Sequence, residues 1–121
     1  MVAVPLGPAP VDIEGVRAGD RNEFQITLTS GGSKLNVTGM TFTASARENR
    51  LDTEHLDAIV TITDGPNGII LVHWPGDAVR TWLGAEETRK GVWDLEMDDS
   101  SNEPLTVAAG VFAAELDVTH P

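Results

Sequence analysis

Histidines are the first side chains in this sequence that could do chemistry. They are His55, His73 and His120, and their wide separation lacks the short spacing typical of zinc ligands. His73 stands beside Trp74 in an apolar run, so we interpret it as a packing or rim residue. The sequence therefore predicts no histidine metal site.

Two carboxylates are the next candidates for chemistry. Asp94 and Glu96 are two positions apart in an alternating segment, which puts them on one face of a strand, about 7 Å apart. Outward carboxylates on a strand are solvated and lack the buried pocket that adjusts a catalytic pKa. The serines show no Gly-x-Ser-x-Gly motif, and there is no Gly-rich phosphate loop. We expect no enzyme activity, no catalytic residue and no cofactor.

An oxygen-rich turn at residues 98–103 offers several possible cation ligands. Its order differs from that of an EF-hand, and the turn at 64–68 is explained by turn geometry alone. Residues 86–103 hold seven acids against Arg89 and Lys90. We interpret this acidic segment as a solvated end of the fold, with a cation site or a basic partner at 94–103 as the alternative. The prediction is that no metal is bound.

Composition limits the possible partners. The chain has 121 residues, 40% of them hydrophobic, which suits one globular domain. A net charge of -11 repels nucleic acid and anionic lipid, and no apolar run reaches the roughly 18 residues needed to span a bilayer. The chain lacks cysteine, so it has no disulfide. We expect neither nucleic acid nor membrane as a partner.

Apolar residues alternate with polar ones along most of the chain, as in strands with one buried face. The expected strands are 11–16, 23–30, 40–47, 58–63, 69–74, 91–97 and 105–119. Glycine-rich and proline-rich turns separate them, and Pro75 ends the fifth. One short helix is expected near residues 76–83, with Val79, Trp82 and Leu83 on one face and Gly84 at its end.

This pattern predicts an all-β fold, an immunoglobulin-like (Ig-like) antiparallel β-sandwich of about seven strands with one short helix. The expected core residues are Phe24, Ile26, Leu28, Phe42, Val60, Ile62, Leu71, Trp93, Leu95 and Val111. Trp74, Trp82 and Trp93 are interpreted as core or end-covering residues rather than as a platform for sugars.

The order of several motifs resembles a known family. The motifs are Ala18-Gly19-Asp20, Leu35-Asn36-Val37-Thr38-Gly39, Asp64-Gly65-Pro66-Asn67-Gly68, Trp93-Asp94-Leu95, Gly110 and Asp117-Val118-Thr119. In this order they resemble the small Ig-like tailed-phage proteins related to the N-terminal domain of baseplate upper proteins. The resemblance covers roughly residues 15–119. It implies a virion structural subunit, and it implies no catalytic residues.

We therefore expect a Pro-rich extended arm at 1–14, an Ig-like domain at 15–119 and a tail at 120–121. An extended arm can add a strand to the exposed sheet edge of a neighbour, although disorder of the arm is the alternative. The expected interface residues are Val4, Pro5, Leu6, Pro8, Pro10, Val11, Ile13, Val118 and Thr119.

The predicted function is that of a non-enzymatic structural subunit of a bacteriophage virion, in the tail or baseplate, such as a minor tail protein. Its expected partners are other virion proteins and copies of itself, and its expected location is the virion, assembled in the host cytoplasm. The first alternative is a capsid decoration protein on the phage head. The second alternative is a carbohydrate- or receptor-binding module.

Overall fold

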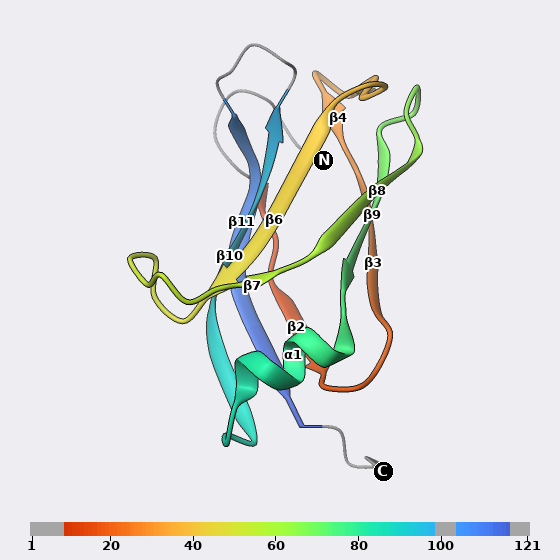
Figure 1. The fold of residues 1–121 in the computed structure, drawn as a ribbon. Helices are drawn as coiled ribbons and strands as arrows, with labels where there is room; N and C mark the ends of the chain where they lie inside the picture. The colour runs from red at the N-terminus through yellow and green to blue at the C-terminus, as the bar shows by residue number, and fades with distance from the viewer. Residues whose placement is uncertain (1–8, 99–103, 117–121) are drawn as a thin grey trace.

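The computed structural model describes residues 9–98 and 104–116, which form two packed β-sheets with a helix at one end (Figure 1). The larger sheet has the order β1-β11-β10-β6-β7, and β2 also pairs with β11. Its strands are β1 (Ala9–Pro10), β2 (Ile13–Arg17), β6 (Thr41–Arg47), β7 (Leu56–Asp57), β10 (Thr88–Asp98) and β11 (Leu105–Glu115).

The smaller sheet has the order β3-β9-β8. Its strands are β3 (Asn22–Thr27), β8 (Ile59–Asp64) and β9 (Ile69–Trp74). A separate hairpin joins β4 (Thr29–Ser30) to β5 (Ser33–Lys34). Gly31 and Gly32 form its turn with φ of 60° and 83°, a backbone region that glycine enters without steric cost. This glycine-rich segment is thus one of the turns that were expected between strands.

Strand order identifies the sandwich as Ig-like. Seven strands of the described chain have five or more residues: β2, β3, β6, β8, β9, β10 and β11. In an Ig domain, strands B, E and D share one sheet and C, F and G the other. The orders β3-β9-β8 and β6-β10-β11 reproduce that division. The predicted all-β sandwich is therefore confirmed, with one difference in its first strand.

That difference is the pairing of the N-terminal segment with the last strand. β1 and β2 both run parallel to β11, with Ala9 opposite Ala108 and Ile13 opposite Phe112, so the larger sheet is mixed rather than purely antiparallel. The expected boundary between arm and domain, at residue 14, falls inside β2. Residues 9–17 are thus built into the sheet; we call them the N-terminal strap.

Helix α1 (Gly76–Leu83) closes one end of the sandwich, as predicted. It begins directly after Pro75 and ends at Gly84, whose φ is 62°. Val79, Trp82 and Leu83 face inward and are buried, because they share one side of the helix. In Figure 1 the helix lies at the lower end of the sandwich, where it contacts β2, β7 and β11.

Four aromatic rings form the centre of the core. Trp74 packs against Phe112 with ring centroids 4.7 Å apart, and against Trp93 at 6.3 Å. Trp82 from the helix meets Phe112 edge-on at 5.6 Å. Such tilted and edge-to-face contacts are favourable arrangements of aromatic rings. All three tryptophans are buried, which confirms that they are core and end-covering residues.

Two of the expected core residues face outward. Val111 is 43% exposed, and Leu71 alternates with Ile70, Val72 and Trp74, the residues of β9 that point into the core. The prediction was wrong for both because their neighbours are also apolar, so the sequence pattern does not distinguish the two faces. Leu28, Trp93 and Leu95 are buried as expected. The remaining five are partly buried against the core: Phe24, Ile26, Phe42, Val60 and Ile62.

Candidate protein-interaction surface

The outward face of the larger sheet is set by alternation along β10. Trp93, Leu95 and Met97 are buried, so the residues between them point away from the core. Strand register then arranges the outward residues in rows across β6, β10 and β11. These rows are Arg47–Val92–Val111, Ser45–Asp94–Ala109 and Thr43–Glu96–Thr106.

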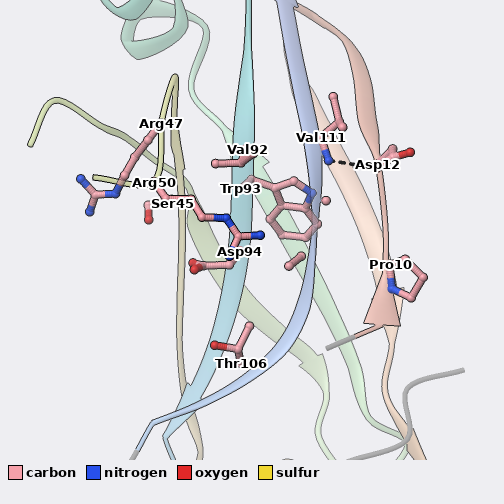
Figure 2. A pocket seen from close by; sticks show the side chains of 12 residues that line it. Pro10, Asp12, Ser45, Arg47, Arg50, Val92, Trp93, Asp94, Thr106 and Val111 are labelled. Carbon is pink, nitrogen blue, oxygen red and sulfur yellow. Dashed lines mark hydrogen bonds between the residues drawn. The ribbon is translucent and has the colours of Figure 1, made fainter. Parts of the chain in front are cut away.

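A pocket of about 700 Å³ lies on this face. Figure 2 shows Arg47 and Arg50 on the β6 side of it, and Pro10 and Asp12 on the opposite side. Val111 belongs to the apolar part of its lining, which runs over β10 and β11. We call this the outer pocket. Its walls come from a loop and from the N-terminal strap, while its floor is a rigid sheet.

Charge is unevenly distributed along the same face. Arg47, Arg50 and Lys90 lie toward one end, since Lys90 is two residues before Val92 on the outward side of β10. Arg47 donates from Nη1 to the carbonyl of Asp52 at 2.7 Å. Neither Arg50 nor Lys90 forms an ion pair with another described residue. The face therefore carries cationic groups that are available to a partner.

Acidic groups occupy the other end of this face. Asp94 and Glu96 follow Val92 on the outward side of β10, and they stand next to Ser45 and Thr43 of β6. Both carboxylates are half-buried. The face thus changes from cationic to anionic along the strand direction, with Val92 and Val111 between the two ends.

A loop at residues 48–55 stands beside the outer pocket and is held at its base by Arg89. The Arg89 guanidinium donates to Glu54 Oε1 at 2.7 Å, to Glu48 Oε2 at 3.0 Å and to the carbonyl of Trp82. It also lies 4.4 Å from the centroid of the Trp82 ring. Burial alone would lower the pKa of Arg89, but the hydrogen bonds to Glu54 and Glu48 outweigh it and raise that pKa.

The tip of this loop is also fixed. The backbone N–H of Asn49 donates to Asp52 Oδ2 at 3.0 Å, and the N–H of Asp52 donates to the carbonyl of Asn49 at 3.0 Å. Leu51 lies between them and is 95% exposed. The loop therefore presents Arg50 and Leu51 from a braced backbone.

Three of the expected interface residues lie in the N-terminal strap. Pro10 is exposed and lines the outer pocket. Val11 donates its N–H to the Ala109 carbonyl at 2.9 Å, and its carbonyl accepts the Trp93 indole N–H at 2.7 Å. Ile13 is 3% exposed and contributes to the chain's own core. The other six lie outside the described residues: Val4, Pro5, Leu6, Pro8, Val118 and Thr119.

Sequence reasoning missed Arg47, Arg50 and Lys90 as surface candidates. Alternation placed Arg47 on the polar side of its strand, but the sequence alone does not show that β6 lies next to β10. The pairing of Arg47 with Val92 brings the three cations to one end of the face. Because acidic residues outnumber basic ones in this chain, the few basic residues were the signal in the sequence that could have indicated this surface.

The described residues contain no group of three or more metal-ligating side chains, and none of their helices is long and apolar enough to cross a membrane. His55 Nδ1 lies 2.8 Å from Asp57 Oδ1 in an exposed pair. The tryptophan rings are buried, so none offers a free face to a sugar ring. His120 and most of the turn expected at 98–103 lie outside the described range.

Similarity to known proteins is found among solved structures. No protein-family model matches the chain, and no curated protein matches it. Among solved structures, the chain is similar to the N-terminal domain of phage TP901-1 ORF48, with a TM-score of 0.48 and 10% sequence identity. The similarity covers 96% of this chain and 95% of that one.

Proposed function

We propose that this chain is a non-enzymatic structural subunit of a bacteriophage virion, located in the tail or baseplate, that works through contacts with other virion proteins. The observation that carries the proposed role in subunit contacts is the outward face of the larger sheet. It combines an exposed apolar residue, Val111, with a pocket and with two cations that have no partner among the described residues. Arginine is enriched at protein interfaces, and the buried centre of an interface is more apolar than the rest of the surface.

Rigidity of the face supports a role in assembly. Its floor consists of β10 and β11, whose 11-residue strands pair with each other along their length. One wall is the N-terminal strap, and the other is the loop that Arg89 braces. A surface that is already ordered loses little conformational entropy when a partner binds. This suits a building block that joins its neighbours in a fixed geometry.

The phage assignment rests on the order of the motifs in the sequence. Several of these residues form hydrogen bonds between segments that are distant in the sequence. The Gly19 N–H donates to the Gly76 carbonyl at 3.1 Å, and the Val37 N–H donates to the Gly65 carbonyl at 2.8 Å. Gly110 lies against the carbonyl of Val11. The motifs that resemble the phage family therefore lie where segments of this sandwich cross, which supports a relation at the level of the fold.

The proposal is tested on particles of the phage or prophage that encodes the chain. Immunogold labelling with an antibody to the purified chain should mark the tail or its tip. Label on the head surface would instead support a decoration protein, and particles without the chain would refute a virion role.

A variant test addresses the surface itself. Arg50→Glu and Lys90→Glu together should reduce incorporation into particles at least several-fold, because they reverse the charge beside the outer pocket. Lys34→Glu in the β4–β5 hairpin makes the same type of charge change on a different surface and should leave incorporation unchanged. Equal incorporation of all variants would exclude this face as the contact.

A further inference from the structure

We infer that the outward face of the larger sheet binds the same face of a second copy of this chain about a two-fold axis. The inference names one partner for the surface described above, and its test uses the purified chain alone. It therefore stands or fails independently of where the protein is located in a particle.

The first argument is the position of charges along β10. Lys90 lies three residues before Trp93, and Glu96 lies three residues after it. Both point outward, because side chains alternate between the two faces of a strand and Trp93 points inward. A two-fold axis that lies between the two faces, parallel to the sheet and perpendicular to β10 at Trp93, brings the faces together with their strands reversed. It places Lys90 of each copy opposite Glu96 of the other, so the same contact forms twice.

Apolar residues occupy the middle of the same arrangement. Trp93 pairs with Gly110 of β11, and Ala109 and Val111 flank that glycine on the outward side. The axis therefore places Val111 of each copy over Ala109 of the other. The 43% exposure of Val111 would be removed by this contact. Loss of exposed apolar area is the main favourable contribution to such an association.

The charges of Asp94 and Arg47 are also complementary across this contact. Asp94 comes opposite Val92 of the second copy, and Val92 is the cross-strand neighbour of Arg47. Each Asp94 carboxylate thus meets a surface that already has a guanidinium beside it. Cross-strand neighbours are about 5 Å apart, which is within reach of an arginine side chain.

The net charge of -11 per copy opposes association in general. At about 0.15 M salt the Debye length is roughly 8 Å, so repulsion between the distant parts of two copies is largely screened. Groups in direct contact are screened much less. A face that brings Arg47, Arg50 and Lys90 together can therefore pair in a strongly acidic molecule.

Contact over three strands is small compared with a standard interface of roughly 800 Å² per partner. We therefore expect a weak dimer with a dissociation constant on the order of 10–100 μM, well above nanomolar. Sedimentation equilibrium of the purified chain from 5 to 500 μM should show a monomer–dimer equilibrium. A chain that stays monomeric at 500 μM overturns the inference.

Charge reversal makes the test specific. Lys90→Glu and Glu96→Lys should each weaken self-association at least 10-fold, since each puts like charges at both copies of the contact. Equimolar mixing of the two variants should restore dimers, because every contact then joins opposite charges. The double variant Lys90→Glu/Glu96→Lys should restore them for the same reason.

Lys34→Glu is the matched control, because it changes the same charge in the β4–β5 hairpin and should leave the dissociation constant within twofold. Circular dichroism checks that each variant is folded. Dimers that persist in both single variants, or that do not return in the mixture, would refute the two-fold contact at this face.

Discussion

Replacement of Gly110 by alanine should detach the N-terminal strap from β11. Gly110 pairs with Trp93 inside the larger sheet, and a Cβ built there would lie 2.1 Å from the Val11 carbonyl oxygen and 2.7 Å from Asp12 Oδ1. Both are closer than any ordinary contact of a Cβ atom. Because Gly110 has no positive φ, the conflict is purely one of space. We expect the strap to move away, since β11 is held on its other edge by β10.

The size of the effect follows from the contacts that the strap makes at this point. Three hydrogen bonds would be lost: Val11 N–H to Ala109, Trp93 Nε1 to Val11, and Val111 N–H to Asp12 Oδ1. At about 1 kcal/mol each they contribute roughly 3 kcal/mol. Alanine stiffens the unfolded chain and returns about 0.4–1 kcal/mol. The free energy of unfolding should fall by about 2–3 kcal/mol, which lowers Tm by roughly 6–12 °C.

Two measurements check this prediction. Urea unfolding gives the change in free energy, and hydrogen exchange followed by NMR should show faster exchange of the Val11 and Val111 amides. Thr43→Ala is a suitable control, because Thr43 is exposed on β6, which pairs with β10 and β7 and not with the strap. Wild-type stability together with unchanged protection of both amides in Gly110→Ala would refute the argument from steric conflict.

Three further substitutions have expected outcomes. Trp93→Phe removes the indole donor to Val11 and should lower the free energy of unfolding by about 1–2 kcal/mol in a urea titration; an unchanged midpoint would contradict it. Arg89→Met should cost about 1–2 kcal/mol, a value reduced because Glu48 and Glu54 are largely exposed. The raised pKa of Arg89 keeps its stabilising charge until the pH rises through that value, so the loss should be equal at pH 7 and pH 10. Leu51→Ser should change stability by less than about 0.5 kcal/mol because Leu51 is 95% exposed, and a larger loss in thermal unfolding would mean that it packs.

Local patterns were sufficient to predict most elements of the fold. The helix was predictable because Pro75 and Gly84 limit it and three apolar side chains share one face. The β10–β11 hairpin was predictable because Trp93, Leu95 and Met97 alternate with polar residues, which allows only one buried face. In β9 the same reasoning failed, since almost every residue is apolar and both faces look alike.

The candidate surface was less predictable, because it depends on which strands become neighbours. The parallel pairing of the strap with β11 brings together residues about a hundred positions apart, such as Asp12 and Val111. Gly15, with φ of 76°, also interrupts the alternation of β2, so Ile13 and Val16 are both buried although they are three positions apart. Neither feature leaves a periodic pattern in the sequence.

Parallel pairing of the first and last strands gives the domain a particular response to mechanical load. The N-terminal strap begins beside the first half of β11, with Ala9 opposite Ala108. It ends beside the last residue of β11, with Arg17 opposite Glu115. A pull on the two ends of the chain would therefore slide the strands past each other along their length. Their hydrogen bonds would share the force together instead of opening one at a time, so the domain should resist stretching far better than one whose terminal strands are peeled apart.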